Sequence, residues 1–79
     1  MTRLVDAMRA LGLDGEIDDE GRWIRLLGER GVVHVLTTPE DDAYYVWCDD
    51  PDEQVVAHHD DPGVAILEGL RRAARHHHS

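Results

Sequence analysis

The residues best able to do chemistry in this 79-residue chain are carboxylates that stand side by side. Paired carboxylates can act together as general acid and general base. The four pairs of consecutive aspartates lie in stretches that read as turns, where water keeps carboxylates ionised. We therefore interpret them as solvated loop residues rather than catalytic pairs. They are Asp18-Asp19, Asp41-Asp42, Asp49-Asp50 and Asp60-Asp61.

The last of these pairs follows two histidines, so that four potential metal ligands stand in a row at residues 58–61. Consecutive residues of a strand point to opposite faces, so these four side chains cannot all converge on one ion. Asp61 also occupies the position of a helix cap. The sequence therefore predicts neither a metal site nor a cofactor.

Nucleophilic catalysis has little support in the sequence. The only serine is Ser79, at the end of the chain, and the only cysteine is Cys48. The acids Asp49 and Asp50, which follow Cys48, disfavour the thiolate that a nucleophile requires. A single cysteine forms no internal disulfide and fits a reducing compartment. We therefore expect Cys48 to be a buried strand residue and the protein not to be an enzyme.

Two helices are indicated by their end signals and apolar spacing. The first is predicted over residues 3–11, with Thr2 as N-cap and Gly12 as the left-handed residue after its end. The second begins after Asp61 as N-cap, with Pro62 at its first position. Gly69 lies in the middle of this helix, where close packing on a strand would explain it. The predicted apolar stripe of the second helix is Val64, Leu67, Leu70 and Ala74.

Strands are predicted between the helices, at residues 22–27, 32–37, 43–48 and 54–58, with a short edge strand at 16–18 kept open. The short loops require an antiparallel meander. The predicted fold is α+β: a two-layer sandwich in which N- and C-terminal helices cover one face of the sheet. We expect one domain over residues 1–75, followed by a disordered, His-rich tail at 76–79 that resembles the remnant of an affinity tag.

Period-two alternation assigns the strand residues to two faces. The face toward the helices is predicted to hold Ile24, Leu26, Val33, Val35, Tyr44, Val46 and Val55. The opposite, open face of a sheet should be mostly polar. In this chain the predicted open face is rich in aromatic and apolar residues instead, which indicates an interface. A register error of one residue would exchange the two faces. The predicted open face holds Trp23, Leu27, His34, Leu36, Tyr45 and Trp47.

Charge is distributed unevenly along the chain, whose net charge is −9. Residues 31–70 hold ten carboxylates and no arginine, whereas residues 71–79 hold three arginines, and lysine is absent throughout. Binding to phosphates requires lysine or arginine, so this acidity argues against nucleic acid or an anionic membrane as the partner. No apolar run is long enough to span a bilayer, and the first residues do not resemble a signal peptide. We expect a cytoplasmic location.

The remaining signal is the combination of acidic loops with an aromatic strand. It predicts a non-enzymatic inhibitor or adaptor that binds a basic, nucleic-acid-binding protein, with the acids steering the encounter and the aromatic residues forming the contact. In size and charge alone, the chain resembles phage-encoded DNA mimics and anti-CRISPR proteins. The predicted partner-binding residues are Trp23, Tyr45, Trp47, Glu40, Asp41, Asp42, Asp49, Asp50, Asp52 and Glu53.

A second hypothesis stays open beside it. The chain would be a small structural domain that dimerises through the open face of its sheet, in a prokaryote with a GC-rich genome or adapted to salt. Its acidity would then serve solubility only. The two hypotheses predict different partners for the same apolar face.

Overall fold

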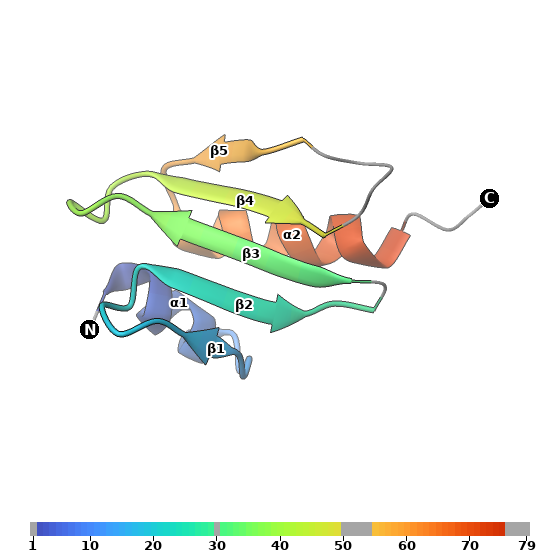
Figure 1. The fold of residues 1–79 in the computed structure, drawn as a ribbon, viewed down its shortest axis with the longest axis horizontal. Coiled ribbons are helices and arrows are strands. Elements are labelled where there is room, and N and C mark those ends of the chain that lie inside the picture. Colours follow the sequence, from blue (N-terminus) through green and yellow to red (C-terminus); the bar gives the residue numbers. More distant parts are fainter. Residues whose placement is uncertain (1, 30, 50–54, 76–79) are drawn as a thin grey trace.

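The structure is a computed structural model that describes residues 2–29, 31–49 and 55–75. One five-stranded antiparallel sheet lies in front of two helices (Figure 1). The strands follow one another in chain order across the sheet, which is the predicted meander with the short edge strand present. The elements are α1 (Arg3–Ala10), β1 (Glu16–Ile17), β2 (Trp23–Leu27), β3 (Val32–Thr37), β4 (Tyr44–Cys48), β5 (Ala57–His59) and α2 (Pro62–Arg75).

Helix α1 begins and ends where the local sequence predicts. The Thr2 hydroxyl accepts a hydrogen bond from the Val5 amide at 3.2 Å, which satisfies an otherwise unpaired donor of the first turn. At the other end Gly12 has φ of +74°, and its amide donates to the Arg9 carbonyl. The Leu13 amide donates to the Met8 carbonyl at 3.1 Å, so the two bonds together form a Schellman motif.

Helix α2 also starts as predicted, because the Asp61 carboxylate accepts hydrogen bonds from the Gly63 and Val64 amides at 2.8 and 3.2 Å. Its predicted apolar stripe is only partly right: Leu70 packs against the core, but two other members do not. Val64 and Leu67 are about half exposed, whereas the sheet-facing residues are small ones spaced by four: Ala65, Gly69 and Ala73.

The stripe is rotated because α2 lies unusually close to the sheet. A Cβ at Gly69 would lie 2.5 Å from Val33 Cγ1 and 2.7 Å from Val46 Cγ2, so only glycine fits at this point. The predicted explanation for the mid-helix glycine is therefore confirmed. Large side chains at 64 and 67 would hold the helix away from the strands, and they lie toward solvent instead.

The core fills the space between the helices and the inner face of the sheet. Seven of its residues belong to β2, β3 and β4, and they alternate with residues of the open face as the predicted register requires. Val55 is the exception to the predicted inner face: it precedes β5 and is 62% exposed. The buried hydrophobic residues are Leu4, Val5, Met8, Ile24, Leu26, Val33, Val35, Tyr44, Val46, Cys48, Ala65, Ile66 and Ala73.

Strand β5 begins at Ala57, three residues later than predicted, and its connection to α2 is polar. The His59 ring is hydrogen-bonded to the Glu68 carboxylate, and Arg72 Nη2 donates to the Val55 carbonyl at 2.6 Å. The hydrogen bond from His59 is the main cause that lowers the pKa of Glu68 below its usual value. The ionised carboxylate of Glu68 is thus favoured in the folded chain.

This pair gives a testable pH dependence. Because the pKa of Glu68 is lower in the folded state, its contribution to stability is present above the unfolded pKa of about 4.3 and is lost as the pH falls through the folded value. We expect the difference in unfolding free energy between the native chain and Glu68→Gln to shrink below about pH 4. Urea unfolding between pH 7 and pH 2.5 measures it. His59→Gln should abolish the same acid-dependent part, and a difference that stays constant over the range would contradict the assignment.

Neither helix in the described part of the chain has the length and apolar character needed to cross a membrane. The predicted tail at 76–79 lies outside the described residues, as do the loop acids at 50, 52 and 53.

Candidate functional site: the open face of the sheet

The open face is the sheet surface opposite the helices, and the strand register places its side chains in two rows. One row runs across β2, β3, β4 and β5 as Trp23, Leu36, Tyr45 and His58. The next row runs from β1 to β4 and consists of Glu16, Arg25, His34 and Trp47. The predicted open face included five of these residues, together with Leu27, and the structure has all six there.

His34 lies at the centre of the face and is only 8% exposed. Its ring stacks on Trp47 with centroids 5.1 Å apart and planes at 9°. Trp23 Nε1 donates toward His34 Nδ1 at 3.4 Å, while His34 Nε2 lies 3.0 Å from Asp49 Oδ2. This geometry assigns the tautomer in which Nε2 carries the proton and donates to Asp49. The histidine therefore connects both tryptophans and one loop acid.

The tryptophans are held in place but remain accessible. Trp23 is 39% exposed, and Trp47 is partly exposed, with one face of its ring against His34. Tyr45 lies beside His58, with ring centroids 5.1 Å apart. Aromatic side chains that are already fixed lose little entropy on binding, which favours this cluster as a contact surface.

On the β1 side of the open face, Arg25 is engaged by neighbouring residues. Arg25 forms an ion pair with Glu16, and its guanidinium carbon lies 5.5 Å from the centre of the Trp23 ring. No such cation is recorded beside Tyr45 or Trp47 among the described residues. The rings of Tyr45 and Trp47 are therefore open to cationic side chains of a partner, whereas the Trp23 ring already has Arg25 beside it.

The predicted acids lie at the two ends of β4. Glu40, Asp41 and Asp42 form the turn from β3 to β4, and Asp49 follows the opposite end of the strand (Figure 1). Asp60 follows His59, which pairs with Tyr44, so it lies at the same end as the turn. The structure thus brings described acids to both ends of the aromatic strand. Asp50, Asp52 and Glu53 belong to the part that is not described.

Asp41 differs from its neighbours because both of its oxygens have partners within the protein. Oδ2 accepts a hydrogen bond from the Arg3 amide at 2.6 Å, and Oδ1 lies 2.7 Å from the Tyr44 hydroxyl oxygen. The residue has φ of 60°, a left-handed conformation that aspartate tolerates. Asp41 joins the turn to the start of α1, whereas Glu40 and Asp42 are exposed.

Within residues 2–29, 31–49 and 55–75, the arrangement does not bring together the groups of a nucleophilic triad. Cys48 and Trp47 are consecutive on β4 and so point to opposite faces; the thiol is buried on the helix side, away from His34 and Asp49. Both nitrogens of His34 are already used in hydrogen bonds. Within the described residues, no three histidine, cysteine or carboxylate side chains are grouped so that they could hold a metal ion.

Sequence reasoning recognised the aromatic face but missed the role of His34, which read as an interruption of an apolar strand. The signal that could have found it is the register. A hairpin loop at residues 28–31 places His34 opposite Arg25, and the β3–β4 turn places it opposite Trp47. Comparison of the chain with protein families, with curated proteins and with solved structures found no match.

Proposed function

We propose that this chain is a non-enzymatic protein-binding module, an inhibitor or adaptor, that docks through the β4 side of its open face onto a basic, nucleic-acid-binding partner. The observation that carries the proposal is that both tryptophans are accessible on one face and fixed there by His34. Tryptophan and tyrosine are enriched among residues that dominate binding energies.

Charge supports a basic partner over a second copy of the chain. Each molecule carries a net charge of −9, so self-association through the open face would bring two acidic surfaces together. Like charges across an interface oppose association, whereas opposite charges accelerate the encounter of two proteins. The exposed acids at both ends of β4 therefore suit a cationic surface that spans the strand. A DNA mimic in the cytoplasm would have this combination of an anionic rim and a desolvated contact.

The proposal is tested by capture and competition. The native chain, immobilised, should retain a nucleic-acid-binding protein from a prokaryotic lysate, and the captured protein should be released by excess duplex DNA. Tyr45→Ala/Trp47→Ala should lose this capture. The matched control Val64→Ala/Leu67→Ala removes similar exposed apolar surface from α2, on the helix layer, and should keep it. Capture should weaken steeply between 50 and 300 mM salt.

Three outcomes would overturn the proposal. The first is capture that both double variants retain equally, and the second is capture that DNA does not displace. The third is a stable dimer of the native chain on sizing chromatography that only Tyr45→Ala/Trp47→Ala dissociates, because the open face would then be covered by a second copy. That result would establish the alternative function, a dimerising domain whose acids serve solubility.

A further inference from the structure

Strand β1 is shorter than β2, and the end of β2 extends past the first residue of β1. Its pairing with β2 covers only Glu16 opposite Arg25 and Ile17 opposite Ile24, so β2 continues for two residues beyond the pairing. Those two residues are Leu26, whose side chain is buried in the core, and Leu27, which is 86% exposed. Leu27 is the most exposed of the large apolar residues in the described part of the chain.

The hydrogen-bond pattern shows where the Leu27 backbone points. Bonds from β2 to β3 involve residues 22 and 28, because the Thr37 amide donates to the Arg22 carbonyl and the Gly28 amide to the Gly31 carbonyl. The bond toward β1 involves residue 23, whose carbonyl accepts from the Asp18 amide. Alternation along an antiparallel strand therefore directs the N–H and C=O of Leu27 toward the β1 side, where the pairing has ended.

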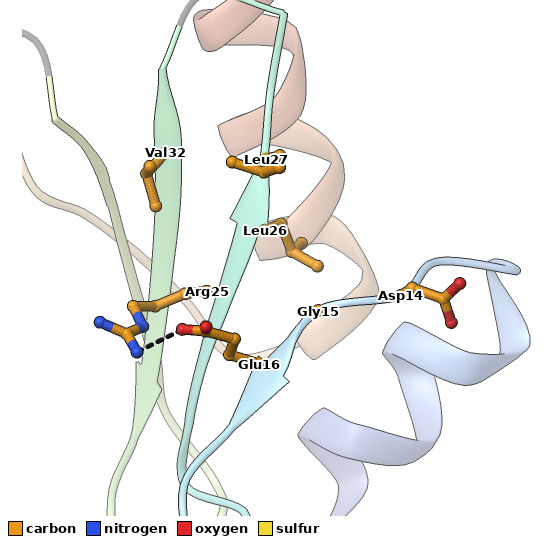
Figure 2. A pocket seen from close by; sticks show the side chains of 7 residues that line it. All are labelled: Asp14, Gly15, Glu16, Arg25, Leu26, Leu27 and Val32. Carbon is orange, nitrogen blue, oxygen red and sulfur yellow. Dashed lines mark ion pairs between the residues drawn. The ribbon is translucent and has the colours of Figure 1, made fainter.

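A groove occupies this position. The chain before β1 turns inward at Gly15, where a Cβ would lie 2.5 Å from Leu26 Cδ2 and 2.7 Å from the Arg25 carbonyl oxygen. The groove has a volume of about 560 Å³, and Figure 2 shows it between the end of β2 and the segment that leads into β1. Its lining residues are Asp14, Gly15, Glu16, Arg25, Leu26, Leu27 and Val32.

Building on the proposed function, we infer that this groove receives an extended, basic segment of the partner, which adds to β2 as a short strand at Leu27. An extended chain supplies the backbone acceptor and donor that the Leu27 N–H and C=O lack on this side. The groove also continues the open face, because the side chains of Arg25, Leu27 and Val32 belong to both.

The charges that line the groove favour a basic segment over a second copy of this chain. The groove holds two carboxylates, Asp14 and Glu16, and its one cation, Arg25, is already paired with Glu16 (Figure 2). Basic side chains of the added segment would meet Asp14, the groove carboxylate for which no ion pair is seen among the described residues. A second copy offering its own β1 edge would bring five carboxylates between residues 14 and 20, which this groove would repel.

The test uses defined peptides and the full chain labelled with ¹⁵N. The probes are a capped hexapeptide of alternating arginine and valine, the same peptide with glutamate for arginine, and the basic peptide with N-methylated valines. The basic peptide should shift the amide signals of Leu27 and Glu16 and slow hydrogen exchange at Leu27. N-methylation, which removes the backbone donors, should weaken its binding by roughly 3- to 10-fold. The acidic peptide should not bind.

Two variants separate this inference from the proposed function. Leu27→Pro removes the backbone donor on a strand edge where proline is tolerated, and Leu27→Arg adds a charge of the same sign as that of the basic peptide. Both variants should weaken the binding of the basic peptide at least about threefold. The amide signals away from the groove should stay native-like. Equal shifts of the amide signals with all three peptides, or shifts confined to the Tyr45–Trp47 region, would overturn the proposal that the groove binds a basic segment. Capture of the partner that depends on Tyr45 and Trp47 but not on Leu27 would then leave the proposed function standing alone.

Discussion

Replacing Gly69 by alanine is expected to destabilise the protein by about 1–3 kcal/mol, although alanine is the better helix former by about 1 kcal/mol. The added methyl group would lie 2.5 Å from Val33 Cγ1 and 2.7 Å from Val46 Cγ2, distances that real Cβ atoms do not adopt. Both valines are fully buried and β-branched, so neither can rotate away without strain. Helix α2 would have to move off the sheet and lose contact with β3 and β4.

Equilibrium unfolding in urea measures this loss. A small domain of this length has a total stability of roughly 4–12 kcal/mol, so a change of this size is readily resolved. The matched control is Gly63→Ala in the first turn of the same helix, where the nearest atom to the added carbon is Asp61 Oδ1 at 3.3 Å. That substitution should change stability by less than about 0.5 kcal/mol. If Gly69→Ala were as stable as the native chain, the close approach of α2 to the sheet would be wrong.

Alkaline pH is expected to destabilise the fold through Tyr44. This side chain is fully buried, and burial is the main cause that raises its pKa to about 12 from the ordinary value of 10.0. The hydrogen bond to the Asp41 carboxylate, together with the charge of that carboxylate, raises it further, because both favour the protonated phenol. A folded pKa above the unfolded one stabilises the protein fully below pH 10, and this contribution is lost as the pH rises through 12.

The rise of the Tyr44 pKa from 10 to about 12 corresponds to about 3 kcal/mol of stability at most, which is lost between pH 9 and pH 12. Other groups also titrate in this range, so the measurement compares the native chain with Tyr44→Phe at each pH. Phenylalanine leaves Asp41 without the tyrosine hydroxyl and should be less stable at pH 8, but the gap should close as the pH approaches 12. A gap that stays constant from pH 8 to pH 12 would show that Tyr44 does not ionise with the raised pKa.

These two predictions concern the layer beneath the candidate site. Tyr44 and Val46 are buried on β4, and they alternate with Tyr45 and Trp47 on the open face of the same strand. A rigid inner face therefore fixes the outer one. Conservative changes on the open face should leave stability largely intact. Because Trp47 also covers His34, binding experiments with Tyr45→Ala/Trp47→Ala are paired with a measurement of unfolding.

Much of the fold could be predicted because its signals are local. As helix caps, Thr2, Gly12 and Asp61 each involve backbone groups within five residues, so these capping roles follow from the sequence around them. The assignment of residues to the two faces is also local, since alternation along a strand is independent of what packs on it. The aromatic character of the open face was therefore predictable, although its function remains a proposal.

Contacts between residues far apart in the chain could not be predicted from local sequence patterns. Which side of α2 faces the sheet depends on how closely Gly69 approaches Val33 and Val46, and helical periodicity alone favoured Val64 and Leu67. The bond from the Asp41 carboxylate to the Arg3 amide spans 38 residues and is absent from any local pattern.

The sequence by itself determined the order of the elements, the helix caps and the residues that each strand shows to either side, because these follow from backbone hydrogen bonding and side-chain alternation over a few residues. Only the tertiary structure decided that His34 contacts both tryptophans and Asp49, and that β2 extends beyond β1 beside a groove. Both depend on the register and spacing of strands brought together by the whole chain. Packing in three dimensions sets those distances.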